Sequence, residues 1–367
     1  MASKAVIAMS GGVDSTVAAA LIKSQGHECT GVTFKLHEPG RPAADRPLAD
    51  NENCNGSCTE DYRIKDALQA AHQIGIPHHT LNLIEAFNKH VIIRFIETYE
   101  AGGTPNPCID CNRFIKFNRL LFKANGLDVD LLVTGHYARI DKDPGGRWLL
   151  RKAADLRKDQ SYVLYSLTQD QLEHVCFPLG ELTKQEVREI ARTHGFENAE
   201  KKESQDICFV PDGDYGAFME AYTGKRYPEG DIIDAEGKIL GRHKGIVRYT
   251  LGQRRGLGVA ANTPVYVSAK NMAANTITLG DESSLLSKTL IARDINLIAC
   301  DNLFKPLRCM VKTRYLEQEK PALVEQTGPD EIRISFDKPK RAVTPGQAVV
   351  FYGGDIVIGG GTIITSL

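Results

Sequence analysis

The chain contains 367 residues, 45 of them Lys or Arg and 46 Asp or Glu, so its net charge is −1, and 42% of the residues are hydrophobic. This composition indicates a globular protein and excludes a disordered tail protein, a collagen and a disulfide-stapled miniprotein. A near-zero charge argues against a protein that coats nucleic acid over its whole surface, but it leaves room for a local basic face. No run of 18 or more apolar residues occurs, so we expect no transmembrane helix and no membrane partner.

The N-terminal residues MASKAV enter a strand pattern at once, so we expect no signal or transit peptide and a cytoplasmic protein. Structural disulfides are rare in that compartment, and clustered cysteines there suggest catalysis, redox chemistry or metal binding. The nine cysteines lie at positions 29, 54, 58, 108, 111, 176, 208, 300 and 309. They form two close pairs, Cys54-x3-Cys58 and Cys108-x2-Cys111.

Strand and helix patterns alternate in the first half of the chain. An apolar run at 4–9, a Gly-rich loop, an Ala-rich helical pattern and a second apolar run at 29–36 form a βαβ unit, which implies a parallel sheet. The pattern then predicts a helix near 59–74, a strand at 78–83, helices near 84–100 and 112–125, and a strand at 130–134. Residues 37–57, rich in Pro, Asn, Asp and Gly, are interpreted as a mobile loop.

A hairpin with its turn at 143–146 and helices at 159–175 and 183–194 are predicted next. Beyond about residue 205, short runs of Val, Ile, Thr and Tyr between Gly, Asn and Pro predict β structure. We therefore expect an α/β N-terminal catalytic domain with a parallel sheet at 1–205, followed by two small all-β domains. These are a central β domain at 206–280 and a C-terminal β-barrel at 281–367.

The hexapeptide Ser10-Gly11-Gly12-Val13-Asp14-Ser15 is the most informative motif. Its glycines allow a tight turn that points several N–H groups at one place, and the following helix adds its positive end, so a phosphate is favoured there. Asp14 is interpreted either as a Mg²⁺ ligand or as a brace of the loop. The glycine patterns of Walker ATPases and dinucleotide enzymes are missing, and the alternative is an ordinary turn between a strand and a helix.

Cys108 and Cys111 lie in a segment that two prolines make stiff. Cys111 stands where a helix is predicted to begin, and a helix N-terminus lowers the pKa of a thiol. Cys208 follows the lysine pair 201–202, whose charge would also favour a thiolate. Taken alone, the C-x-x-C pair fits a zinc knuckle equally well, and Cys208 fits a small buried hydrophobe.

In their order, these motifs resemble those of the tRNA-specific 2-thiouridylase (MnmA-type) family of PP-loop ATP pyrophosphatases along nearly the whole chain. The matching segments are the loop at 10–15, TPNPC-x-x-CN-x-x-IKF at 104–117, TGHYAR at 134–139, KDQSYVLY at 158–165, residues 204–209, TLGQRRGLG at 250–258 and Pro345-Gly346-Gln347. The resemblance implies a Rossmann-like N-terminal domain of the adenine nucleotide alpha hydrolase type. It also implies a tRNA uridine 2-sulfurtransferase that acts on the wobble uridine.

The implied reaction has two halves. ATP adenylates the C2 oxygen of the uridine with loss of pyrophosphate, and sulfur from a protein persulfide then displaces AMP. By the match, Cys208 carries the persulfide and Cys111 is the nucleophile that attacks it, through a Cys111–Cys208 disulfide that cellular reductants reopen. The implied cofactors and partners are ATP, Mg²⁺, the tRNAs for Lys, Glu and Gln, and a cysteine desulfurase or sulfur carrier, with the enzyme acting as a monomer.

The resemblance also assigns binding residues. The ATP site comprises Ala8, Met9, Ser10, Gly11, Gly12, Val13, Asp14, Ser15, Phe34 and Gly135. The target base meets Asn106, Pro107 and Cys108. Contacts with tRNA are implied at His136, Lys158, Asp159, Gln160, Arg314, Tyr315 and Gln347.

The chain departs from the family at Cys108, where many members have an aspartate that is a candidate acid–base group. A thiol, with a reference pKa of about 8.5, could serve there only if its pKa were shifted toward neutrality. The extra thiol opens a second hypothesis, in which Cys108, Cys111 and Cys208 hold a [4Fe-4S] cluster with one iron open to exogenous sulfur. A zinc site shared with Cys54 and Cys58 is a further alternative, without a supporting His pattern.

Residues 238–255 carry six Lys or Arg and no acid, and Lys152, Arg157 and Lys158 form a second basic cluster. A solvated charge run is the simpler explanation, but Tyr249 and the interspersed glycines favour RNA phosphate contacts. Two other classes stay open. Another PP-loop ligase, such as an argininosuccinate synthase, would not need the three thiols, and the intact 10–15 loop argues against a non-catalytic tRNA-binding or iron–sulfur sensor protein.

Overall fold

The computed structural model describes residues 3–37, 62–118, 122–123, 126–127, 129–201, 207–210 and 212–367. Cys54, Cys58, the interior of the loop predicted at 37–57 and residues 204–206 lie outside the described residues. Among the residues that are described, no helix is both long and apolar enough to cross a membrane. The chain forms two compact units, of which unit 1 contains Met1–Val91, Cys108–Phe209 and Asp355–Val357, and unit 2 contains Ile92–Pro107, Val210–Gly354 and Ile358–Leu367.

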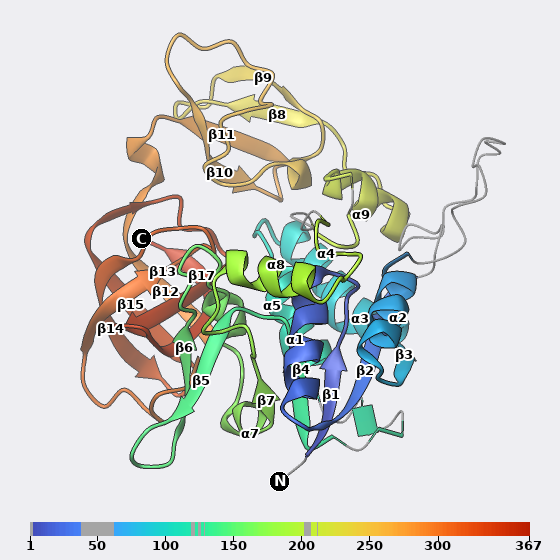
Figure 1. The fold of residues 1–367 in the computed structure, drawn as a ribbon. Helices are drawn as coiled ribbons and strands as arrows, with labels where there is room; N and C mark the ends of the chain where they lie inside the picture. Colours follow the sequence, from blue (N-terminus) through green and yellow to red (C-terminus); the bar gives the residue numbers. More distant parts are fainter. Residues whose placement is uncertain are drawn as a thin grey trace, which may run out of the picture. The chain divides into compact units, whose positions relative to one another are not determined.

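A five-stranded parallel sheet forms the centre of unit 1 (Figure 1). Its strands, in spatial order, are β3 (His78–Asn82), β2 (Glu28–Lys35), β1 (Lys4–Ala8), β4 (Leu131–Thr134) and β7 (Val175–Cys176). Strands β2 and β3 lie on one side of β1, and strands β4 and β7 lie on the other. This is the arrangement of a doubly wound sheet. Ligands bind such sheets at the carboxyl ends of the strands, and the 10–15 loop follows β1 directly.

Helices α1 (Val13–Ser24), α2 (Tyr62–Ile74) and α8 (Lys184–Thr193) pack together on one face of this sheet (Figure 1). The Ala-rich face of α1 is fully buried, because Val17, Ala18 and Ala19 have no exposed surface. Small side chains allow helix and sheet backbones to approach closely, so the helix that follows the Gly-rich loop is held rigidly on the sheet. The other helices of this half of the chain are α3 (Ile84–Phe87), α5 (Pro107–Cys111) and α7 (Gln169–Glu173).

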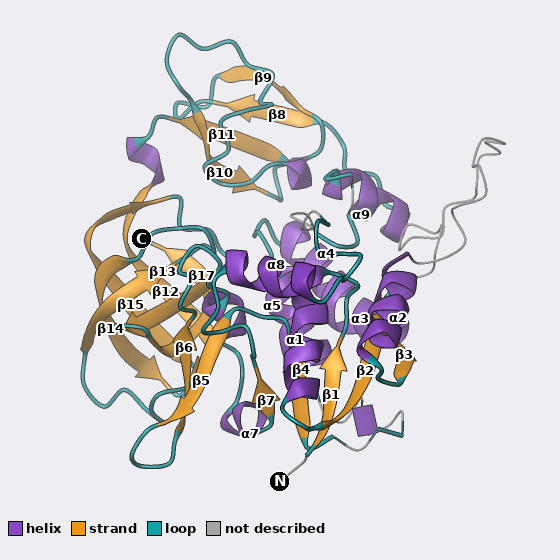
Figure 2. Ribbon diagram, viewed as in Figure 1, coloured by secondary structure: helices purple, strands orange, loops and turns teal. Residues whose placement is uncertain are grey.

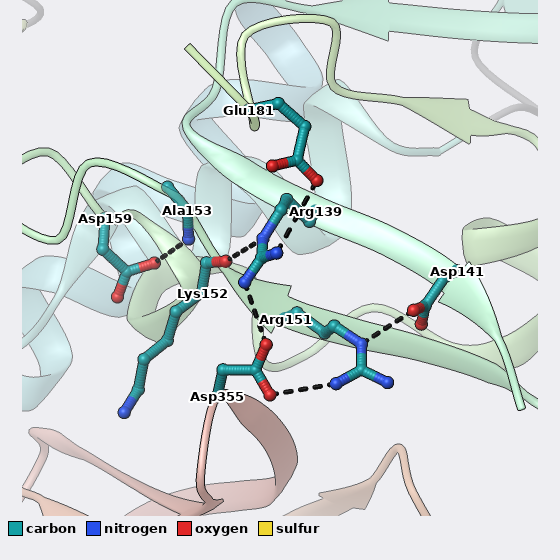
Figure 3. Close-up of polar contacts among 8 residues, drawn as sticks. All are labelled: Arg139, Asp141, Arg151, Lys152, Ala153, Asp159, Glu181 and Asp355. Carbon is teal, nitrogen blue, oxygen red and sulfur yellow. Dashed lines mark hydrogen bonds and ion pairs between the residues drawn. The ribbon is translucent and has the colours of Figure 1, made fainter. Parts of the chain in front are cut away.

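The hairpin predicted around the turn at 143–146 is present as β5 (Ala138–Lys142) and β6 (Trp148–Lys152). Asp355, far along the chain, belongs to the same unit, and its carboxylate accepts hydrogen bonds from Arg139 and Arg151, each at 2.9 Å (Figure 3). The Lys152 amide also donates to the Asp355 carbonyl at 2.8 Å. One aspartate therefore joins both strands of the hairpin to a C-terminal segment, and its negative carboxylate is held by the positive charges of the two arginines.

One predicted helix is wrong, because residues 159–175 do not form a single helix. They contain a 3₁₀ turn at Ser161–Leu164, the helix α7 and the edge strand β7. The break occurs at Thr168, whose hydroxyl accepts from the Gln171 amide while the Gln171 side chain accepts from the Thr168 amide. This capping box fixes the start of α7 at Gln169, so the 3₁₀ turn at Ser161–Leu164 does not continue into that helix.

Among its described residues, unit 2 contains the α-helices α4 (Ile93–Glu100) and α9 (Tyr215–Thr223) and short 3₁₀ turns at Ile246–Arg248 and Ser283–Leu285, together with strands and loops (Figure 2). A four-stranded sheet has the order β10 (Tyr266–Asn271), β11 (Thr276–Gly280), β8 (Gly230–Ile233) and β9 (Ile239–His243). Its buried His243 is satisfied on both ring nitrogens, by the Gly245 amide and the Asn275 carbonyl.

The last six strands form a closed barrel, which confirms the predicted β-barrel. They are β12 (Leu286–Leu297), β15 (Glu331–Arg341), β14 (Lys320–Gly328), β13 (Leu307–Lys312), β16 (Ala348–Gly353) and β17 (Ile356–Ser366), and β17 pairs back onto β12. Closure removes the exposed strand edges. The barrel interior is filled by apolar side chains that include Leu290, Val324, Ile334, Val349 and Phe351.

Candidate active site in unit 1

The Gly-rich loop between β1 and α1 is held by its own side chains. The Ser15 hydroxyl donates to the Gly12 carbonyl at 2.9 Å and accepts from the Ser10 amide at 3.2 Å. Gly11 has a φ of +74°, and a Cβ there would lie 2.8 Å from the Arg63 carbonyl of α2. The loop therefore needs glycine at position 11 for conformation and for space.

Asp14 acts as a brace of this loop, which was one of its two predicted roles. Both of its carboxylate oxygens accept from the Lys184 ammonium, at 2.7 and 2.8 Å, and one also accepts from the Tyr137 hydroxyl at 2.7 Å. Lys184 is the first residue of α8, and the capping box of Thr183 fixes the start of that helix. Sequence reasoning missed Lys184, because no local pattern pairs it with a residue 170 positions away.

The residues assigned to the ATP site come together at the carboxyl edge of the sheet. Ala8 pairs with Thr134 in the strand register, so Met9 and Gly135 follow neighbouring strand ends. A Cβ on Gly135 would lie 2.7 Å from the Asp14 carbonyl carbon and 2.8 Å from the Ser15 amide nitrogen. Phe34 lies near the end of β2, where its ring contacts Phe122 edge-on at 5.8 Å. The Gly-rich loop and the 134–135 segment are therefore in direct contact.

The two neighbouring cysteines lie on a helix that begins earlier than predicted. Helix α5 starts at Pro107, so Cys108 is in its first turn and Cys111 is its last residue. Proline is favoured at the first position of a helix, because its missing N–H has no partner there in any case. The prediction that Cys111 occupies a helix start is wrong, and the helix N-terminus does not lower the pKa of its thiol.

The three thiols at 108, 111 and 208 are close enough for their charges to interact, since Cys108 and Cys208 both raise the pKa of Cys111, and Cys108 raises that of Cys208. Cys111 is buried, and burial raises the pKa of its thiol to about 12. Cys108 and Cys208 have exposed surface, yet the surrounding protein displaces enough water to raise the pKa of both. The structure therefore brings the candidate catalytic thiols together, and all three are unbridged.

Two cations near the thiols were not singled out from the sequence. Lys116 opposes the rise in pKa at Cys108, Cys111 and Cys208 alike, and Arg63 does so at Cys208. Lys116 ends a π-helical turn, Asn112–Lys116, that continues α5. Lys201, which was expected to act on Cys208, instead pairs with Asp66.

Replacing Lys116 by methionine is expected to slow alkylation of Cys108 and Cys208 by iodoacetamide about three- to tenfold at pH 8. Removing the cation raises the thiol pKa further, so a smaller fraction of each thiol is ionised at that pH. Peptide mass spectrometry of time points measures both rates. Arg113→Met, in the same π-helical turn but with its guanidinium over the Phe114 ring at 5.1 Å, is the matched control. Equal rates in wild type and Lys116→Met would contradict the electrostatic role.

Within the described part of the chain, no group of three or more His, Cys, Asp or Glu is arranged to hold a metal ion. The two carboxylate oxygens of Asp14, a candidate Mg²⁺ ligand, both accept from Lys184.

Several residues assigned to tRNA contact have structural roles in unit 1. His136 is buried against Phe117 and Phe177, and burial lowers its pKa well below the usual value, so the ring is neutral. Asp159 is also buried and accepts from the Ala153 and Ser161 amides. These side chains shape the unit around the 134–137 segment. Lys158 is half-buried, and the Gln160 side chain accepts from the Tyr137 amide at 2.9 Å.

The basic run at 238–255 lies in unit 2 and presents most of its charges to solvent. Its exposed members are Lys238, Arg242, Lys244, Arg254 and Arg255. Arg248, by contrast, pairs with Asp214 and Glu220, and Tyr249 is buried. Tyr249 therefore does not present its ring to a nucleic acid, contrary to the expectation from the sequence.

The family comparisons divide the chain into three matches. Residues 3–212 match a model described as tRNA methyl transferase HUP domain, residues 216–281 a tRNA methyl transferase PRC-barrel domain, and residues 287–363 an aminomethyltransferase beta-barrel domain. A tRNA-specific 2-thiouridylase MnmA of Clostridioides difficile is 47% identical over 100% of this chain and 99% of its own length. That of Halothermothrix orenii is 46% identical over 98% of both chains.

Among solved structures, a 4-thiouridine synthetase–RNA complex with bound ATP shares 21% identity, covers 57% of this chain and 45% of its own, and has a TM-score of 0.35. The parallel sheet, the Gly-rich loop and the three matches define a HUP-domain protein that carries two additional β domains. With relatives 43–47% identical along the full chain, it belongs to the MnmA family of tRNA-specific 2-thiouridylases.

Proposed function

We propose that this protein is an ATP-dependent tRNA uridine 2-sulfurtransferase that forms 2-thiouridine at the wobble position. The observation that carries the proposal is the gathering of three thiols in the same compact unit as a Gly-rich phosphate loop. Nucleotide activation and sulfur transfer each need one of these features. A methyl transfer, as the description of the HUP-domain model would suggest, needs neither a cluster of thiols nor an adenylation site.

In the first half-reaction, the C2 oxygen of the uridine attacks the α-phosphorus of ATP, pyrophosphate leaves, and the N3 proton of the uridine is released to solvent. The Gly-rich loop and the N-terminus of α1 would hold the phosphates, because free N–H groups and the helix dipole favour negative charge. Ala8 to Ser15, Phe34 and Gly135 are the proposed ATP site, and Mg²⁺ bound with the nucleotide would neutralise phosphate charge there. Lys184 would hold the loop in shape through Asp14.

In the second half-reaction, Cys208 carries a persulfide. The Cys111 thiolate attacks the Cys208 sulfur, a Cys111–Cys208 disulfide forms, and hydrosulfide leaves with the electron pair. The hydrosulfide attacks C2 of the adenylated uridine, AMP leaves with the former C2 oxygen, and the remaining proton goes to N3. Two electrons from external thiols then reduce the disulfide.

The exposed charges of the basic run, together with Lys158, Arg314 and Tyr315, are the proposed tRNA contacts, with Asn106, Pro107 and Cys108 next to the target base. The C2 atom is inaccessible in a stacked base, so the base must leave the stack. We further propose tRNAs for Lys, Glu and Gln as substrates, a cysteine desulfurase or sulfur carrier as donor, and a cytoplasmic monomer with domains at 1–205, 206–280 and 281–367.

The direct test uses the full chain, ATP, a persulfide donor and an unmodified tRNA transcript for Lys. Pyrophosphate release and 2-thiouridine in the digested tRNA are measured together. We expect both products, and neither from a transcript with cytidine at the wobble position. An enzyme that releases no pyrophosphate with the uridine transcript would overturn the proposal.

The iron–sulfur route is separated from the persulfide route by anaerobic purification with iron analysis. On the persulfide route we expect full activity in iron-free protein, because a persulfide on Cys208 and a thiolate at Cys111 need no metal. Activity that follows iron content and is lost in Cys108→Ser would instead favour the cluster.

A further inference from the structure

The segment that leads into the cysteine-bearing helix is held by a turn near the end of the chain. The Gln347 side-chain amide donates to the Thr104 and Pro105 carbonyls, each at 3.0 Å. The Thr104 amide donates to the Pro345 carbonyl at 2.8 Å. All of these residues belong to unit 2, and helix α5 begins two residues after Pro105. Three hydrogen bonds therefore hold the backbone just before Cys108.

The backbones of the two segments lie so close together that glycine is required at two positions. A Cβ on Gly103 would lie 2.9 Å from the Pro345 carbonyl oxygen. Gly346 has a φ of +85°, and a Cβ there would lie 2.5 Å from the Thr98 methyl carbon and 3.1 Å from the Thr104 amide nitrogen. Neither glycine can be replaced without moving one of the two segments. The turn and the 103–105 segment thus form a rigid clamp.

The two prolines explain why a side chain is needed here. Pro105 and Pro107 have no N–H, so between Thr104 and Cys108 only Asn106 can donate a backbone hydrogen bond. The segment cannot be held by an ordinary strand ladder, and its carbonyls need donors from elsewhere. A glutamine amide carries two N–H donors, and Gln347 directs its nitrogen to two successive carbonyls.

The same geometry bears on a direct contact with tRNA. Phosphate oxygens accept hydrogen bonds and therefore need donors from the protein. The two donors of the Gln347 amide are already directed to Thr104 and Pro105, and its oxygen can only accept. Gln347 is thus poorly suited to bind a phosphate while the clamp is closed.

We propose that Gln347 is a positioning residue for sulfur transfer, which holds the Thr104–Pro105 segment so that α5 presents Cys108 and Cys111 to the reacting sulfur. This inference rests on the proposed function and assigns to the C-terminal barrel region a part in the chemistry. Misplacement of a reacting group by about 1 Å can reduce a rate about 100-fold, so loss of the clamp should be seen in the rate of transfer.

The test compares wild type with Gln347→Leu, which keeps the approximate size of the side chain and removes both donors. Gln326→Leu is the matched control, because Gln326 lies in the same barrel and accepts from the Leu303 amide in a different loop. Three quantities are measured: the Kd for tRNA by filter binding, pyrophosphate release, and the single-turnover rate of 2-thiouridine formation at saturating tRNA. For Gln347→Leu we expect a rate about 30- to 100-fold lower with a Kd within about twofold of wild type.

An unchanged rate at saturating tRNA, with a Kd raised about tenfold, would make Gln347 a tRNA contact and overturn the inference. Wild-type protein that forms neither pyrophosphate nor 2-thiouridine would overturn the proposed function instead. Amide hydrogen exchange tests the clamp independently of enzyme activity. Exchange of the peptide covering 104–111 should be about tenfold faster in Gln347→Leu than in wild type and unchanged in Gln326→Leu. Equal exchange rates in wild type, Gln347→Leu and Gln326→Leu would contradict the clamp. If Gln347→Leu does not fold, Gln347→Met takes its place in all of these measurements.

Discussion

The variant Cys208→Ser is expected to form 2-thiouridine at least about 1,000-fold more slowly than wild type. One turnover of pyrophosphate release should continue near the wild-type rate. The reason is that the hydroxyl cannot carry a persulfide, whereas the nucleotide is activated at the Gly-rich loop by other residues. Rapid-quench assays with unmodified tRNA measure both products in one experiment. Equal loss of both half-reactions would show that Cys208 is needed for the fold or for ATP.

The companion variant Cys111→Ser separates the two thiols. It should lose 2-thiouridine formation to the same extent, yet its Cys208 should retain the extra sulfur atom that mass spectrometry detects, because nothing attacks the persulfide. Cys309→Ser is the matched control, since Cys309 lies in β13 of the barrel and burial raises the pKa of its thiol to about 12. Full activity in Cys208→Ser would refute the persulfide route.

Gly135→Ala is expected to reduce pyrophosphate release about 100-fold. The added methyl group would lie 2.7 Å from the Asp14 carbonyl carbon and 2.8 Å from the Ser15 amide nitrogen, a distance that only movement of the Gly-rich loop can relieve. Because both neighbouring atoms are backbone, no side-chain rotation removes the clash. The measurement is the ATP dependence of pyrophosphate release, in which we expect the maximal rate to fall.

The control for this variant is Gly145→Ala in the turn of the β5–β6 hairpin, where the heavy atoms nearest to a Cβ are those of the Asp143 carboxylate, the closest at 3.2 Å. That side chain can move, so we expect activity within about twofold of wild type. Thermal unfolding of both variants separates a local loop effect from loss of the fold. Wild-type pyrophosphate release by Gly135→Ala would show that the loop tolerates displacement and is not the ATP site.

Elements with a strong local signal could be predicted from the sequence. The βαβ unit, the hairpin at 138–152 and the start of α8 depend on neighbouring residues, and the structure has all three. The helix predicted at 159–175 failed although its signal was local, because Thr168 and Gln171 form a capping box that breaks the pattern. The start of α5 was also misjudged, since Pro107 was interpreted as a stiffener of a loop and not as the first residue of a helix.

The environment of the thiols could not be predicted, because a pKa depends on what surrounds the group in space. A cysteine at a supposed helix start was expected to have a lowered pKa, yet burial raises the pKa of Cys111 to about 12. The cation that opposes this rise, Lys116, lies in a π-helical turn that no sequence pattern announces. Water exclusion and the positions of charges are properties of the folded chain.

By itself, the sequence determined the chemical parts of this protein: a Gly-rich loop made for phosphate, a set of cysteines suited to sulfur chemistry, and an order of motifs that defines its family. These follow from residue type and short spacing, which folding does not change. Only the tertiary structure decided which distant residues contact the Gly-rich loop and the segment before the cysteines. Lys184 reaches Asp14 across 170 positions, and Gln347 reaches Thr104 across 243. Such pairs form because the sheet, the helices and the barrel bring their backbones together, and a linear pattern contains no information about that approach.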